Sequence, residues 1–249
     1  MSHRLKGRAS PNRGTPSRDL WRALWEDADA SHLTTNPRRA PMTSWLHEER
    51  LQAVQSVVRE TGATRVLDLG CGDGDLFVRL ASEPGLAALV GVDICRASLA
   101  RLRSRLAAYD VCVPSIELRE ASMTEPTPDL AGFDCAVLVE TIEHIDPSRL
   151  SQLESALFRT LRPRQIVITT PNAEFNAVLG VPPHRMRHPG HRFEWDRPKF
   201  RRWCRRAGDA AGYVALFHDI AGHHPAFGGA SQMAVFTRTD AVAPPAADV

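Results

Sequence analysis

The sequence predicts an α/β protein with a doubly wound, mostly parallel sheet of seven strands. Between residues 64 and 170, short apolar runs alternate with amphipathic segments of helix length. The first two apolar runs also carry an acidic residue near the point where the strand should give way to a turn. Such alternation is typical of parallel strands joined by helices that cover both faces of one sheet.

The 249-residue chain is long enough for one sizeable core, and we expect one folded domain over residues 41–238. Residues 1–40 are rich in Arg, Ser, Pro and Gly, which predicts a disordered basic tail. Within that tail, Trp and Leu at helical spacing favour a short helix at 19–27. Residues 239–249 are expected to form a disordered tail rich in Ala and Pro.

The expected elements follow in order from a helix at 41–60, which has one apolar side and is stopped by Thr61-Gly62. Strands are predicted at 64–69, 88–93, 115–119, 133–139 and 165–170, and helices at 74–83, 96–108 and 148–161. Residues 171–195 show no periodicity and predict a long loop, which in a compact domain is usually functional or disordered. A helix at 197–210 and strands at 212–218 and 231–237 complete the fold.

Composition excludes several classes of protein. The net charge of +2 is too small for a bulk polycation, and no apolar stretch approaches the length of a membrane span. The five cysteines are scattered without a Cys-x-x-Cys pair, as is usual for reduced thiols. We therefore expect a cytoplasmic protein, with a monomer as the default state.

The first strand runs into a turn with the sequence Asp68-Leu69-Gly70-Cys71-Gly72. Glycines there allow the backbone to approach a ligand closely, and the following helix offers free N–H groups. Asp93 ends the second strand, where a carboxylate is placed to accept hydrogen bonds from both hydroxyls of a ribose. Asp68 would repel a pyrophosphate, so this turn favours a nucleoside ligand that carries cationic groups.

This arrangement resembles the class I methyltransferases, which use S-adenosylmethionine and have a Rossmann-like fold. The resemblance implies that Asp68 lies beside the methionine part of the cofactor and that Gly70 and Gly72 form its cradle. It also implies that Asp93 binds the ribose hydroxyls and that Ser122, after the third strand, lies near the adenine.

A second group of polar residues, Glu140, Glu143 and His144, follows the fourth strand. On one helical turn these three side chains can converge. Two carboxylates and an imidazole suit a divalent metal. A Glu-His pair at this place is also common in methyltransferases without a metal, where it packs against the cofactor, so the stretch alone leaves both interpretations open.

Two further runs are more specific: Thr-Thr-Pro-Asn-Ala-Glu-Phe-Asn at 169–176 and Arg-His-Pro-Gly-His-Arg-Phe-Glu-Trp at 187–195. Together with the Glu-x-x-Glu-His stretch, they resemble the Hua-enhancer family, the small-RNA 3′-terminal 2′-O-methyltransferases, over residues 45–236. The resemblance implies a divalent ion that grips the terminal ribose of the RNA. Its implied ligands are Glu140, Glu143, His144 and His191.

The expected ion is Mn²⁺, with Mg²⁺ or Co²⁺ as alternatives, because imidazole ligands suit the softer ions. The family usually has an acid immediately before the last histidine, whereas this chain has Gly190, which predicts a lower metal affinity. His184 and His188 lie close by in the sequence. The Phe-Glu-Trp run that follows favours His191, so we expect His188 to lie outside the ligand set.

The implied activity is metal-dependent transfer of a methyl group from S-adenosylmethionine to the 2′-hydroxyl of the 3′-terminal nucleotide of RNA. The implied partners are the 3′ end of a single-stranded RNA and, as in some bacterial relatives, an RNA kinase–phosphatase–ligase repair protein. Arginines between 185 and 206 are expected to contact phosphates. The alternatives are a small-molecule O-methyltransferase of the same fold, whose members lack the 171–195 runs, and a non-catalytic RNA-binding protein.

Overall fold

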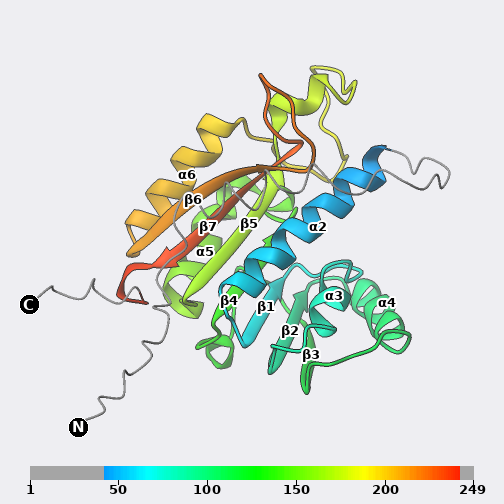
Figure 1. The fold of residues 1–249 in the computed structure, drawn as a ribbon. Helices are drawn as coiled ribbons and strands as arrows, with labels where there is room; N and C mark the ends of the chain where they lie inside the picture. The colour runs from blue at the N-terminus through cyan, green and yellow to red at the C-terminus, as the bar shows by residue number, and fades with distance from the viewer. Residues whose placement is uncertain (1–41, 242–249) are drawn as a thin grey trace, which may run out of the picture. The chain divides into compact units, whose positions relative to one another are not determined.

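The computed structural model describes residues 42–241 of the chain (Figure 1). The expected basic tail at 1–40 with its short helix at 19–27, and the last eight residues of the chain, lie outside the described part. Within it, residues 42–239 belong to one compact unit. No helix in the described range is both long and apolar enough to cross a membrane. All five cysteines are free thiols.

A single seven-stranded sheet forms the centre of this unit, in the order β3-β2-β1-β4-β5-β7-β6. Only β7 runs antiparallel to its two neighbours, so the predicted doubly wound, mostly parallel sheet is confirmed. The strands are β1 (Arg65–Leu69), β2 (Ala88–Asp93), β3 (Ser115–Glu120), β4 (Cys135–Val139), β5 (Gln165–Pro171), β6 (Tyr213–Ile220) and β7 (Ser231–Arg238).

Helices cover both faces of the sheet. Figure 1 shows α2 lying across one face, with α5 and α6 behind the sheet. The helices are α2 (Met42–Glu60), α3 (Phe77–Ala81), α4 (Arg96–Leu106), α5 (Leu150–Ser155) and α6 (Arg197–Asp209). The helix expected at 74–83 is shorter because Gly74, with φ of +86°, still belongs to the glycine turn. The helix expected at 148–161 is present, but its second half is a π-helical turn.

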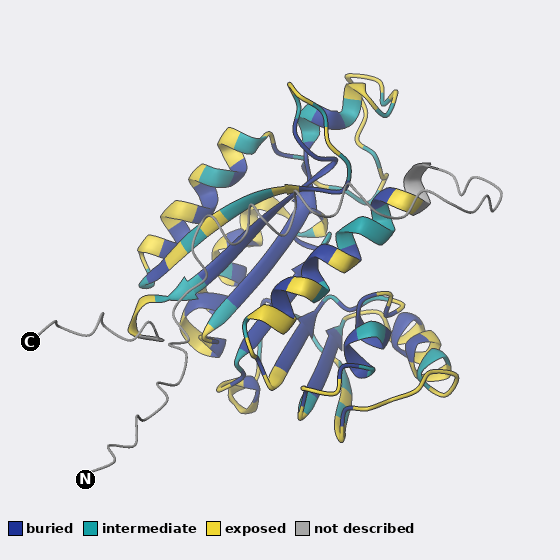
Figure 2. Ribbon diagram, viewed as in Figure 1, coloured by how far each residue is buried: buried dark blue, intermediate teal, exposed yellow. Residues whose placement is uncertain are grey.

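The central strands are buried on both faces, and they appear dark blue in Figure 2. Leu67 of β1, Leu138 of β4 and Ile168 of β5 are fully buried. Such continuous burial is what a parallel sheet between two helical layers requires. The chain order reverses between β1 and β4, and in open α/β sheets ligands bind beyond the carboxyl ends of the strands at that point.

Candidate active site

The turn after β1 is built from glycines in the left-handed region and is tied to the end of β2. Gly70 and Gly72 have φ of +78° and +53°. The Gly72 N–H donates to Asp93 Oδ2 at 2.8 Å, and the Cys95 N–H donates to Asp93 Oδ1 at 2.7 Å. Asp93 therefore joins the turn after β1 to the start of α4, at the sheet edge where the sequence placed a ribose.

Asp68 lies in β1 just before this turn, and its residue surface is only 3% exposed. Burial raises the pKa of its carboxyl to about 7, and the nearby charge of Asp93 adds to the effect. A cationic ligand would relieve both causes, because it would supply the positive charge that the buried carboxylate lacks. The role of Asp68 beside the methionine part of the cofactor stays a prediction, and it would meet this electrostatic need.

The turn after β1 also packs directly against the turn after β4. A Cβ built on Gly70 would lie 2.3 Å from Thr141 Cγ2 and 3.0 Å from Met123 Cε. Met123 follows Ser122, whose hydroxyl pairs with Thr124 Oγ1 at 2.8 Å. Gly70 thus links three segments: its own glycine turn, the polar turn after β4, and the segment expected near the adenine.

Substitution of Gly70 with alanine should lower the free energy of unfolding by about 2–4 kcal/mol, because it adds backbone strain and a clash with Thr141. Gly62→Ala is the matched control. Gly62 has φ of +63°, but nothing lies within 4 Å of its added Cβ. The control should therefore cost about 1–2 kcal/mol of backbone strain alone. Urea unfolding measures both; equal losses would show that the Gly70 contact is unimportant.

Glu140 opens the turn after β4 in a left-handed conformation, with φ of +50°. The predicted single helical turn is therefore not formed; a 3-10 turn covers only Ile142–His144. The carboxylate of Glu140 accepts from Thr169 Oγ1 at 3.0 Å and Ser231 Oγ at 3.2 Å, and pairs with Arg50 Nε at 3.4 Å. A strained non-glycine residue held by this many partners is typical of functional sites.

Glu143 is fully buried, at 0% exposure. Thr170 Oγ1 donates to its Oε2 at 3.0 Å, whereas its Oε1 has no hydrogen-bond partner among the described residues. Burial raises the pKa of Glu143 well above its usual range, and the charge of Glu140 raises it further. Burying a carboxylate oxygen without a donor lowers the stability of the folded protein, and a bound cation would remove this cost by pairing with the oxygen.

Two histidines are held in the tautomer that a metal requires. His144 Nδ1 lies 3.2 Å from the Gly190 carbonyl, and His191 Nδ1 lies 2.6 Å from Glu194 Oε1. Because a carbonyl or an ionised carboxylate only accepts, each Nδ1 is a donor in these hydrogen bonds, which leaves Nε2 as the nitrogen of each ring that can bind a metal. Metal-binding histidines almost always donate their other N–H in this way.

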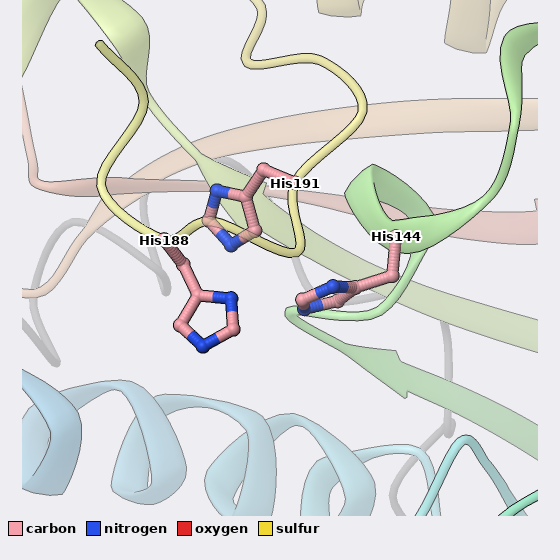
Figure 3. Close-up of side chains that lie close together, drawn as sticks. All are labelled: His144, His188 and His191. Atoms are coloured by element: carbon pink, nitrogen blue, oxygen red, sulfur yellow. The ribbon is translucent and has the colours of Figure 1, made fainter.

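The three rings of His144, His188 and His191 converge beyond the end of β4 (Figure 3). Their ligand nitrogens all lie within 4.8 Å of one another, and the His144 and His191 ring centres are 4.8 Å apart. The carboxylates of Glu140 and Glu143 lie outside this group. Of the four ligands that the family resemblance implies, the structure thus brings the two imidazoles together, and it places the two carboxylates on the turn that carries His144.

Glu194 contacts His191 and was given no role in the sequence analysis. Its side chain is 3% exposed and also accepts from Asn176 Nδ2 and the Arg187 backbone N–H, each at 2.7 Å. Burial opposes its ionisation, but the hydrogen bonds from Asn176, His191 and Arg187 hold its pKa below the usual range. The charge that orients His191 therefore comes from position 194.

The arginines of 185–206 do not form one free basic surface. The Arg187 guanidinium donates to Asn176 Oδ1 at 2.5 Å and the Ala230 carbonyl at 2.6 Å, which fixes the loop after β5. Arg197 pairs with Glu174, and Arg206 pairs with Glu154. Arg185 and Arg192, by contrast, are exposed on that loop. The phosphate contacts expected of Arg187 are therefore replaced by a structural role.

The sheet order and the glycine turn with its two aspartates define a class I, S-adenosylmethionine-dependent methyltransferase fold. A family model described as "Methyltransferase domain" matches residues 66–164. The crystal structure of magnesium protoporphyrin IX methyltransferase from Synechocystis with bound SAH superposes with a TM-score of 0.59 at 16% identity, over 88% of this chain and 93% of that one. At that identity the likeness concerns the fold alone.

Closer relatives give the family. The crystallised methyltransferase domain of bacterial CtHen1 is 33% identical, with a TM-score of 0.69, over 77% of this chain and 99% of that domain. The small RNA 2′-O-methyltransferase of Gallus gallus is 34% identical over 70% of this chain and 48% of its own length. This chain belongs to the Hen1 family, the Hua-enhancer family that its sequence resembles. It spans about half the length of the vertebrate relatives it matches.

Proposed function

We propose that this protein transfers a methyl group from S-adenosylmethionine to the 2′-hydroxyl of the 3′-terminal nucleotide of a single-stranded RNA, with the help of a divalent metal ion. The observation that carries the proposal is the contact between the two turns at Gly70 and Thr141. In this proposal, the contact brings the cofactor turn beside the turn that carries Glu140, Glu143 and His144. Relatives named small RNA 2′-O-methyltransferases support the choice of acceptor.

The residues of the turn after β4 and the loop after β5 suit a divalent ion. Glu143 offers a buried oxygen that has no donor within residues 42–241, and His144 and His191 offer Nε2 as a ligand atom while Nδ1 is held by its partner. Glu140 is a fourth ligand in the proposal, and Arg50 balances its charge until an ion does so. When bound, such an ion would lower the pKa of a ribose hydroxyl, as it does for water.

In this proposal, the protein's own side chains position the two reactants. Asp93 holds the cofactor ribose and Asp68 faces its positive charge, so the methyl group is presented at the carboxyl end of β1. The turn after β4 positions the terminal ribose of the RNA beside it, so that one hydroxyl lies in line with the methyl carbon. Most of the acceleration then comes from positioning two bound reactants.

A methyl-transfer assay with four matched RNA ends tests the proposal. The purified chain should methylate an oligonucleotide that ends in a 2′,3′-diol and should protect it from periodate. Oligonucleotides that end in 2′-deoxyribose, in 3′-phosphate or in a 2′-O-methyl group should not react. Chelator should stop the reaction and Mn²⁺ should restore it. Activity that survives chelation, or that continues on the 3′-phosphate, would contradict the metal-dependent mechanism.

The same assay separates the other functions that the fold permits. A small-molecule O-methyltransferase would leave all four oligonucleotides unmodified while still binding the cofactor. A non-catalytic RNA-binding protein would bind the diol end without methyl transfer at any metal concentration. Only the proposed enzyme gives transfer that depends on both the metal and the free diol.

A further inference from the structure

We propose that His188 is a third imidazole ligand of the metal site, in addition to His144 and His191. This inference rests on the proposed function, because it concerns the same ion. This inference differs from the expectation from the sequence, where the Phe-Glu-Trp run favoured His191 and His188 was expected to lie outside the ligand set.

The geometry of the three rings supports this larger ligand set. The ring centre of His188 lies 5.6 Å from that of His144 and 5.4 Å from that of His191. Two nitrogens on one ion at about 2.1 Å each are at most about 4.2 Å apart. The ligand nitrogens of the three rings lie within 4.8 Å of one another, so shifts of a few tenths of an ångström bring them to one ion.

The hydrogen bonds of His188 leave it ready to bind a cation without losing a proton. The Gly190 N–H donates to His188 Nδ1 at 3.0 Å, so Nδ1 carries a lone pair and no hydrogen. To bind an ion through Nδ1, the ring gives up only its hydrogen bond from the Gly190 N–H. Gly190 is half-buried, so a water molecule can then accept from that N–H. His188 itself is exposed, so solvent and ions reach it freely.

Gly190 makes this arrangement possible. A Cβ at this position would lie 3.0 Å from His188 Nδ1 and 3.3 Å from His144 Nδ1, so a side chain there requires the two rings to shift by a few tenths of an ångström. The backbone of Gly190 is outside the left-handed region, so its conformation does not require glycine. The residue therefore matters through the space that it leaves for the two imidazoles.

A site with three imidazoles should prefer softer divalent ions. Imidazole suits Co²⁺ and Zn²⁺ better than Mg²⁺, which favours oxygen ligands. The inferred role of His188 is thus to set metal selectivity, and its removal should change the ratio of Co²⁺ to Mg²⁺ affinity as well as the affinity itself.

Cobalt titration of the full chain, followed by visible absorption, tests the inference, and pulsed EPR of bound Cu²⁺ counts the coordinated imidazoles. We expect three imidazoles in the natural protein and two in His188→Ala, with the Co²⁺ dissociation constant raised about tenfold or more. Gly190→Ala should weaken Co²⁺ binding in the same direction. His184→Ala, at an exposed position of the same loop, is the matched control and should bind Co²⁺ as the natural protein does.

The possible results separate this inference from the proposed function. If the natural protein binds Co²⁺ and His188→Ala binds it equally well with the same imidazole count, His188 is not a ligand, while the proposed methyl transfer stands. If the natural protein binds no divalent ion, both the inference and the metal-dependent function are wrong. Unchanged S-adenosylmethionine affinity in each variant shows that the fold is intact.

Discussion

Replacement of Glu143 with glutamine is expected to abolish methyl transfer, with a loss of about 1,000-fold or more. The substitution keeps the shape of the side chain and its contact with Thr170. It removes the ability to ionise from a buried carboxyl group whose Oε1 has no donor among the described residues. If that oxygen holds the ion, several kcal/mol of charge stabilisation are lost, at 1.36 kcal/mol for each factor of ten. Single-turnover transfer to a diol-ended RNA at saturating Mn²⁺ measures the loss.

Glu60→Gln is the matched control for this prediction, because Glu60 is exposed at the end of α2. The control should keep full activity, and both variants should bind S-adenosylmethionine normally. If the Glu143→Gln enzyme were active, Glu143 would not be a metal ligand, and the proposed site would have no buried carboxylate beside its histidines.

The same variant should be more stable than the natural protein when no metal is bound. The folded-state pKa of Glu143 is raised, so its favourable contribution is present below the unfolded pKa and is lost as pH rises through the folded value. At pH 8, far above the unfolded pKa, the natural protein has lost part of this contribution, and glutamine, which does not ionise, should raise the free energy of unfolding by about 1–3 kcal/mol. Added Mn²⁺ should stabilise only the natural protein.

The fold is readable from the sequence because its signals are local. A short, mostly apolar run such as Val66–Leu69 followed by glycines favours a buried strand, and segments of helix length separate it from the next runs. The predicted start of α3 at residue 74 was too early, because Gly74 has a left-handed backbone with φ of +86° and the helix begins at Phe77. Periodicity reports which side chains face the core, and it does not report the backbone conformation of a turn.

The site is only partly readable, for a different reason. The residues that follow β1, β2 and β4 lie at the same edge of the sheet, so the strand order alone predicts that they are close to one another. The loop after β5 has no periodicity, and its course is fixed by the Arg187 guanidinium and by isolated contacts to the chain around Ala230. The path of this loop brings Glu194 to His191 and His188 to His144. Neither contact can be predicted from the spacing of residues in the sequence.

The absence of an acid at position 190 led to the expectation of weak metal binding, and Glu194 offers a physical reason to revise it. An acid that orients a ligand histidine must accept its Nδ1–H and remain ionised. Glu194 does both, since it lies 2.6 Å from His191 Nδ1 and its pKa is held low by its donors. Its position on the loop therefore supplies the orientation that was attributed to the missing acid.

Replacement of Glu194 with glutamine should accordingly lower the metal affinity by about 10–100-fold, the usual effect of losing a partner that orients a ligand histidine. The amide is neutral, and its NH₂ group must face either His191 or Asn176, which are both donors. The Mn²⁺ dissociation constant measures the effect, and activity should return at high Mn²⁺ because the ligands themselves remain. Glu174→Gln, which alters only the ion pair with Arg197, is the control. Unchanged Mn²⁺ affinity in Glu194→Gln would show that the carboxylate does not orient His191, and a loss that Mn²⁺ cannot restore would show that it acts through the loop instead.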